Sequence, residues 1–181
     1  MTTIIVYEES GRASPLDATD DARQIHARLA ALGVGFERQD ASLPLPQDAD
    51  AGFILRVYAE AIERLRCRGG YKSVDVFRLL PNSPNRAEAR HKFLGEHTHT
   101  DDEVRFFVEG GGTFFLRAGG RVVELRAERG DLISIPATTR HWFDCGDPPF
   151  CTAIRLYGHP DGWVGAFTGD EIVARFATVP A

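Results

Sequence analysis

Apolar positions in the first third of the chain recur at helical spacing. A short apolar run in residues 1–10 (MTTIIVYEES) predicts an opening strand. Beyond it, Ala22, Ile25, Leu29 and Leu32 have the spacing of one helix face. The glycines of the following GVG segment supply a left-handed residue that ends this predicted helix.

A second amphipathic stretch covers residues 51–70 (AGFILRVYAEAIERLRCRGG). Asp50 stands where an N-cap is expected, and the pair Gly69–Gly70 ends the pattern. We predict one helix here, joined to the first by a proline-bearing connector, SLPLPQDADA. The apolar positions that fall on one side of this helix are Ile54, Leu55, Tyr58, Ile62 and Leu65.

From Tyr71 onward the pattern changes from that of helices to that of strands. YKSVDVFRLLP is rich in β-branched and aromatic residues, and prolines then break it. NRAEARHKF predicts one or two helical turns, and DEIVARFA predicts a short helix near the C-terminus. The runs between them that are typical of strands are VRFFVEG, GTFFLRAGG, RVVELRAERG, DLISIPA, HWFDCG and FCTAIRLYG.

Glycines at Gly110–Gly112, Gly119–Gly120 and Gly130 separate several of these runs. Short strands at close spacing with glycine turns are typical of an antiparallel sandwich or barrel. The sequence therefore predicts a mainly β fold in a single domain of residues 1–181, with a helical part at about 15–70 and a barrel at about 71–177.

Composition and charge narrow the classes of partner. The net charge is −5 and the arginines are interleaved with acids, so no basic stripe suited to nucleic acid is present. No stretch approaches the ~20 apolar residues that span a bilayer, and the first residues lack the basic flank of a signal peptide. The three cysteines form neither a disulfide framework nor a CxxC knuckle. We expect a cytoplasmic monomer with reduced thiols, no nucleic-acid partner and no membrane partner.

The segment EHTHTDDEVRFF holds a cluster of metal-ligand residue types. In an extended chain His97, His99 and Glu103 share one face, and His141 follows about forty residues later after IPATTR. Hairpins bring such positions together in the mouth of a barrel. Three imidazoles and a carboxylate suit Fe, Ni, Mn, Co or Zn, and they leave two octahedral positions open for a substrate. The alternative is a polar surface turn, which the apolar run VRFFV and the later GDxxxIPxxxxH make less favourable.

These motifs resemble those of a known superfamily. GEHTHTDDEVRFFVEG is similar to the first metal motif of the cupins, and GDLISIPATTRHWF is similar to the second. Within the cupins, the chain resembles the acireductone dioxygenases of methionine salvage almost continuously over residues 71–177. The further stretches that carry this resemblance are YKSVDVFRLLP, KFLGEHTH, HWFDCG, TAIRLYG and GWVGAFTG.

The resemblance implies a cupin barrel, a double-stranded β-helix or jelly roll, in which Fe²⁺ or Ni²⁺ is bound by His97, His99, Glu103 and His141. The implied substrates are O₂ and an acireductone, 1,2-dihydroxy-3-keto-5-methylthiopentene. The implied products with iron are formate and 4-methylthio-2-oxobutanoate. With nickel they are formate, carbon monoxide and 3-methylthiopropanoate.

Two positions depart from the family pattern. Thr138 replaces the usual glycine two residues after the motif proline, and Cys145 replaces a methionine often found before Gly146. Neither change removes a predicted ligand. Thr138 is expected to alter the turn before His141, and Cys145 introduces a thiol near the site.

Two arginines are candidates for catalysis. Arg105 lies two residues after Glu103 and should share its inward face, where a guanidinium needs an anion. The enediolate of the substrate is one such anion, and a salt bridge to Glu96, Asp101 or Asp102 is the alternative. Arg155, in the strand TAIRLYG, is a similar candidate.

The resemblance also implies a wall for the methylthio tail formed by Phe93, Phe143 and Trp163, for which plain core packing is the alternative. Glu96 and Asp102 flank the ligands and are candidates to accept imidazole N–H groups, although Asp102 also fits a solvated turn. The other histidines, which we do not expect to be ligands, are His26, His91 and His159.

Two non-dioxygenase functions remain open at the level of sequence. One is a metal-binding cupin that senses or stores a ligand without turnover. The other is a cupin isomerase that acts on a sugar or keto acid. The expected open metal positions, Arg105 and the aromatic wall favour an enzyme over a sensor.

Overall fold

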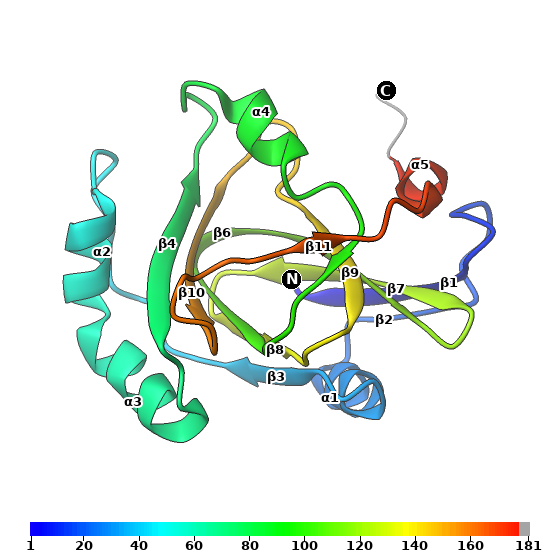
Figure 1. The fold of residues 1–181 in the computed structure, drawn as a ribbon, viewed down its shortest axis with the longest axis horizontal. Helices are drawn as coiled ribbons and strands as arrows, with labels where there is room; N and C mark the ends of the chain where they lie inside the picture. The colour runs from blue at the N-terminus through cyan, green and yellow to red at the C-terminus, as the bar shows by residue number, and fades with distance from the viewer. Residues whose placement is uncertain (178–181) are drawn as a thin grey trace.

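Two antiparallel sheets that share the long strand β6 form the centre of the fold (Figure 1). The computed structural model describes residues 1–177, so the last four residues of the predicted single domain lie outside the described part. One sheet contains β4, β10, β8 and β3 together with the first half of β6, and the other contains β11, β5, β9, β7, β1 and β2 with its second half. The predicted mainly β fold is confirmed.

The strands are β1 (Thr3–Glu8), β2 (Asp17–Thr19), β3 (Gly35–Arg38), β4 (Ser73–Leu79), β5 (His97–Thr98), β6 (Glu103–Ala118), β7 (Arg121–Glu128), β8 (Asp131–Ile135), β9 (Arg140–Asp144), β10 (Cys151–Tyr157) and β11 (Ala166–Phe167). The helices are α1 (Ala22–Ala31), α2 (Ala51–Val57), α3 (Ala59–Gly69), α4 (Arg86–His91) and α5 (Ile172–Phe176). Within residues 1–177, no helix has both the length and the apolar character needed to cross a bilayer.

Strand β6 runs straight through a glycine segment that was expected to separate two strands. Its residues 103–106 pair with β8, and its pairing with β10 extends from residue 103 to residue 110. Its residues 111–118 pair with β7, and residues 113–117 pair with β9. A Cβ on Gly111 would lie 2.1 Å from the carbonyl oxygen of Ala127, and one on Gly112 would lie 2.3 Å from the Phe143 ring. These glycines therefore allow close approach of neighbouring groups, and the prediction of a break there is wrong.

The second predicted helix is divided in two at Tyr58, which has φ of −101° and ψ of 16°. Its hydroxyl donates toward the carbonyl oxygens of Ala41 and Leu43 at 3.2 and 3.3 Å, and its ring meets Phe106 edge-on. These contacts hold the connector against the helix at the point of the break. The predicted N-cap is present, because Asp50 accepts from the backbone N–H of Phe53 at 2.6 Å.

Helices α2 and α3 lie along the outer side of β4 and cover one face of its sheet (Figure 1). Val104 and Phe106 of β6 point to this outer face, where they pack with apolar residues of both helices. The alternate residues Glu103, Arg105 and Phe107 point to the inside of the barrel. The two-residue period of one strand thus separates the core beneath the helices from the interior that holds the site.

The sequence pattern missed the strands β2, β3, β5 and β11. Each has only two to four residues, which is too short for an alternation of apolar and polar positions to stand out. Two of them matter for function, because β5 carries the first histidine and β11 pairs with it.

Candidate metal centre

Three histidines from two strands of the barrel meet in its interior. His97 belongs to β5 and pairs directly with His141 of β9, while His99 follows β5 by one residue. One ring nitrogen from each lies within 4.8 Å of the others. All three side chains are buried. The structure therefore brings together the three histidines that the spacing singled out.

Backbone carbonyls fix the orientation of all three imidazoles. The Nδ1 atoms of His97, His99 and His141 lie 2.7, 2.7 and 2.8 Å from the carbonyl oxygens of Gly95, Val164 and Thr139. A carbonyl oxygen only accepts, so we infer that each Nδ1 carries the proton and each Nε2 presents its lone pair. The three Nε2 atoms are thus free to bind a metal ion and lie close together.

The two carboxylates expected to orient these imidazoles make other contacts. Glu96 is buried and accepts from Arg117 at 3.2 Å and from the Thr168 hydroxyl at 2.6 Å. Asp102 accepts from the backbone N–H of Ala137 at 2.9 Å. The hydrogen bond from Thr168 to Glu96 secures the chain just after β11. The hydrogen bond from Ala137 to Asp102 secures the turn before His141. The expectation that Glu96 and Asp102 accept imidazole N–H groups is wrong, because each Nδ1 lies within hydrogen-bond distance of a backbone carbonyl.

Glu103 adds a carboxylate to the three imidazoles. Its Oε2 lies 2.9 Å from His99 Nε2 and 3.9 Å from His141 Nε2, and its Oε1 accepts from Arg105 Nη2 at 2.6 Å. Burial alone would raise the pKa of Glu103, but Arg105 and the imidazoles outweigh it and hold this pKa well below its usual range. The carboxylate is therefore anionic.

The surroundings lower the pKa of two of the imidazoles and raise that of the third. Burial lowers the pKa of His141 to about 3, so its ring is neutral at pH 7. Burial also lowers the pKa of His97. For His99, burial acts in the same direction, but the Glu103 carboxylate 2.9 Å away prevails and raises the pKa.

A divalent cation fits this cluster. Within the described residues, His99 Nε2, His141 Nε2 and Glu103 Oε2 are buried and have no hydrogen-bond partner. Buried lone pairs without partners are costly, and a metal ion satisfies all of them at once. Three imidazole nitrogens and one carboxylate oxygen suit the borderline divalent metals of the first transition row.

Arg105 is enclosed by the site. It is 2% exposed, and its guanidinium carbon lies 4.2 Å from the Phe143 ring centre and 4.7 Å from that of Phe114. The salt bridge expected as the alternative to a catalytic role, with Glu96, Asp101 or Asp102, is not formed. Arg105 pairs with Glu103, and its Nε and Nη1 have no partner within the described residues.

Arg155 lies directly opposite Arg105 in the register of β10 and β6. Asp75 of β4 accepts from its Nε and Nη2 at 2.8 and 2.7 Å. Its Nη1 is buried and has no partner in the described chain. Asp75 was not singled out from the sequence, although its place in the alternating SVDVF run puts it on the inward face.

The aromatic residues of the predicted wall lie close to one another. Phe93 and Trp163 meet edge-on at 5.4 Å between ring centres, and Trp163 lies 5.5 Å from His97. Phe143 packs beneath the Arg105 guanidinium. Phe77 links the two parts of this wall, at 5.2 Å from Phe93 and 6.4 Å from Phe143. The sequence missed Phe77 because an aromatic residue within a strand is most often ordinary core.

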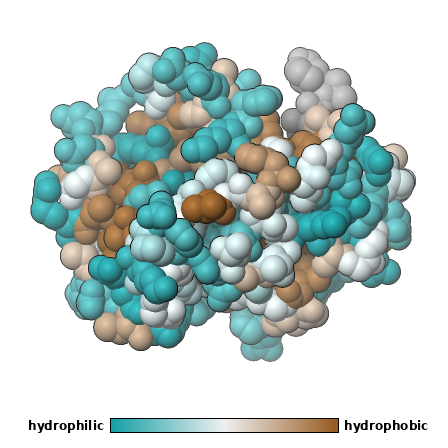
Figure 2. Space-filling model, in the orientation of Figure 1, coloured by the Kyte–Doolittle hydropathy of each residue, from teal (hydrophilic) through white to brown (hydrophobic). Residues whose placement is uncertain are grey.

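A loop that ends in β11 covers the histidines from outside. The carbonyl of Val164 holds His99, and the Phe167 ring lies 5.7 Å from His97. Both side chains are about half exposed. Figure 2 shows apolar atoms at the surface in the middle of the face that β11 crosses in Figure 1. This segment therefore forms the outer boundary of the site.

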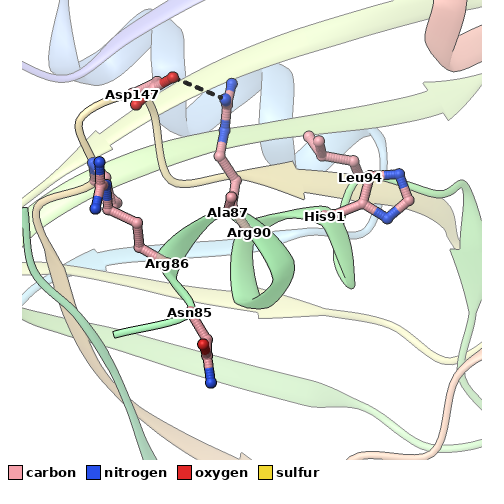
Figure 3. Close-up of a pocket in the computed structure, with 8 residues that line it drawn as sticks. Asn85, Arg86, Ala87, Arg90, His91, Leu94 and Asp147 are labelled. Carbon is pink, nitrogen blue, oxygen red and sulfur yellow. Dashed lines mark ion pairs between the residues drawn. The ribbon is translucent and has the colours of Figure 1, made fainter. Parts of the chain in front are cut away.

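A separate pocket of about 420 Å³ lies beside α4 (Figure 3). Arg90 enters it, with Asp144 at 2.6 Å and Asp147 at 3.7 Å, and His91 also lines it. None of the three clustered histidines lines this pocket. His91 thus lies outside the metal cluster, as expected, and the same holds for His26 and His159.

Cys145 is buried near the site, and burial raises the pKa of its thiol to about 11. The thiol is therefore protonated at pH 7. Because the thiolate is the form that reacts with oxidants, this environment protects Cys145.

Thr138, where the resemblance implies a glycine, adopts the left-handed conformation with φ of +65°. A β-branched residue is strained there, by about 1–2 kcal/mol, and glycine gives back part of this through its freer unfolded chain. We expect Thr138→Gly to raise the melting temperature by about 2 °C, which corresponds to a gain just below 1 kcal/mol. Thr139→Gly, at a position without positive φ, should lower it. A lower melting temperature for Thr138→Gly contradicts the assignment of strain.

Comparisons with known proteins agree with the resemblance read from the motifs. The sequence matches the model of the ARD/ARD′ family over residues 4–165. An acireductone dioxygenase of Parvibaculum lavamentivorans is 54% identical over 176 residues, which are 97% of this chain and 96% of the relative. One from a Synechococcus species is 46% identical over 99% of this chain and 100% of the relative.

One solved structure supports the fold. An acireductone dioxygenase from Bacillus anthracis with a cadmium ion in its active centre matches with a TM-score of 0.80. It is 33% identical and covers 92% of this chain and 98% of its own.

Proposed function

The chain belongs to the ARD/ARD′ family, and from this premise we propose that it is a metal-dependent dioxygenase that cleaves an acireductone with O₂. The observation that carries the proposal is a cluster of three imidazoles, two of which place Nε2 at 2.9 and 3.9 Å from a buried carboxylate oxygen, beside two arginines with unpartnered N–H groups. A sensor that does not turn over its ligand does not require two positioned cations. An isomerase would not consume O₂.

The proposed ligands are His97, His99, Glu103 and His141. These residues would hold a divalent ion, which would supply Lewis-acid chemistry that favours the enediolate. Glu103 is divided between two tasks, because Oε1 binds Arg105 while Oε2 faces the imidazoles. Arg105 thereby holds the carboxylate in one orientation.

We assign Arg105 and Arg155 as the catalytic cations. Their unpartnered N–H groups lie on one inward face, opposite each other across β6 and β10. An anionic enediolate in this interior meets two positive charges that are already fixed in place, Arg105 by Glu103 and Arg155 by Asp75. Fixed charges of this kind stabilise developing negative charge without reorganisation.

Phe93, Phe143 and Trp163 are the proposed contacts of the methylthio tail. They form an apolar surface next to the histidines and exclude water from the reacting carbons. Both atoms of O₂ enter the products, and the substrate supplies the four electrons. No change of metal valence is required.

The proposed metals are Fe²⁺ and Ni²⁺, because nitrogen and carboxylate ligands do not select strongly between them. We expect the stripped protein reloaded with Ni²⁺ to release carbon monoxide from the acireductone, and the Fe²⁺ sample to yield 4-methylthio-2-oxobutanoate without carbon monoxide. Headspace analysis of both samples, with stripped protein as the blank, measures this. Identical products from both metals contradict metal-directed chemistry but leave a dioxygenase intact.

Oxygen uptake by the reloaded protein, after addition of the acireductone under argon and then O₂, tests the reaction itself. We expect uptake well above that of the stripped protein and of substrate alone. Loss of the acireductone without O₂ consumption indicates an isomerase. Binding without any loss indicates a sensor, and either result overturns the proposal.

A further inference from the structure

Tyr157 occupies the same inward row of the barrel as the carboxylate of the metal centre. In the register of the sheet it lies opposite Glu103 of β6 on one side and Ser73 of β4 on the other. Residues directly opposite in an antiparallel pair point to the same face. The Tyr157 ring accordingly lies 6.4 Å from that of His99, and the Arg155 guanidinium carbon lies 5.7 Å from the Tyr157 ring centre.

The hydroxyl of Tyr157 is buried without a partner. The residue is 3% exposed, and its oxygen has no hydrogen-bond partner in the described part of the chain. The cross-strand hydroxyl of Ser73 donates elsewhere, to the carbonyl oxygen of His159 at 2.7 Å. A buried hydroxyl without a partner is costly, so its presence calls for an explanation beyond packing.

Other unpartnered donors lie near it. Arg155 Nη1 and Trp163 Nε1 have no partner in the described chain, and the Trp163 ring lies 5.7 Å from that of His99. A phenol near neutral pH, an indole and a guanidinium all donate. These groups therefore suit a ligand that presents several acceptor oxygens and carries negative charge.

We propose that the Tyr157 hydroxyl is a specificity-determining donor that hydrogen-bonds an oxygen of the anion held at the metal centre. The inference rests on the proposed function for the presence of the metal, and it adds a donor on the β10 side beside Arg155. Phenylalanine fills the same space, so the hydroxyl contributes recognition of oxygen-rich anions and no packing that phenylalanine lacks.

The variant Tyr157→Phe isolates this donor. It keeps the ring and removes a hydroxyl that binds nothing else in the described chain, so stability should stay the same or rise. Tyr7→Phe is the matched control, because Tyr7 packs against Phe176 in a separate cluster. Thermal melts of both variants establish that any change in binding is not a change in folding.

Calorimetric titration of the Ni²⁺-loaded proteins with oxalate measures the effect. Oxalate is a dianion with acceptor oxygens left over after chelation, whereas imidazole binds the metal as a neutral ligand without oxygen. We expect Tyr157→Phe to weaken oxalate about tenfold and to leave imidazole unchanged, which is the effect of one hydrogen bond to a charged group. Tyr7→Phe should match the unmodified protein for both ligands.

Two results overturn the inference: oxalate affinity within about twofold of the unmodified protein, or an equal loss for oxalate and imidazole, which indicates a distorted metal site. The oxalate result does not depend on turnover. A selective loss of oxalate binding without O₂ consumption from the acireductone therefore leaves the donor in place and overturns only the proposed reaction.

Discussion

His141→Ala is expected to lose tight binding of divalent metal, and with it all measurable dioxygenase turnover. His141 is the only one of the three histidines on β9, and it is 1% exposed with its Nε2 unpartnered. Alanine offers no donor atom in place of this ring, which lies 6.2 Å from the apolar ring of Phe114. Loss of only an outer contact costs about 10–100-fold in metal affinity, so loss of this ligand should exceed that range.

Competition with a fluorescent chelator measures the affinity, and elemental analysis of the purified variant measures the content. His26→Ala is the matched control, since His26 is an exposed histidine on α1 outside the cluster. Full metal content and unchanged affinity in His141→Ala would show that the remaining donors suffice and that His141 is no ligand.

The metal ligands could be predicted from the sequence because three of the four proposed ligands lie close together in the chain. His97, His99 and Glu103 lie within seven residues, and their common phase follows from an extended chain. His141 could be added only through its motif, because the residues around it do not show that β9 pairs with β5. The β-branched and aromatic composition of the longer runs, bounded by glycines and prolines, likewise predicted the major strands.

The features that could not be predicted from the sequence depend on contacts between segments that are distant in the chain. The break at Tyr58 depends on two carbonyl groups of the preceding connector, and the continuity of β6 depends on what approaches Gly111 and Gly112 from outside the strand. The orientation of the imidazoles depends on loop carbonyls, which have no side-chain signature. Such features require the register and the loop paths, and these follow only from the folded chain.

The paired charges in the interior give the last prediction, which concerns stability and its dependence on metal. Arg105→Met keeps apolar volume between the rings of Phe114 and Phe143 but leaves Glu103 without its cation. In the stripped protein, Glu103 is then a buried carboxylate that has lost its guanidinium partner and has only imidazoles beside it. Breaking a buried pair in this way costs about 3–5 kcal/mol, so the melting temperature should fall by about 6–20 °C.

A bound metal should reduce this loss of stability. The guanidinium of Arg105 contacts Oε1 of Glu103, whereas the ion would place positive charge beside Oε2, so the ion partly replaces the lost charge. Melting curves with and without Ni²⁺ should therefore show a much smaller loss for loaded Arg105→Met. Arg155→Met is the matched control: its partner Asp75 has a side chain 44% exposed, so water solvates the freed carboxylate and the loss should be small and independent of metal. An equal loss for Arg105→Met in stripped and loaded protein means that the metal and the guanidinium do not share Glu103. The proposed division of that carboxylate between Arg105 and the ion then fails.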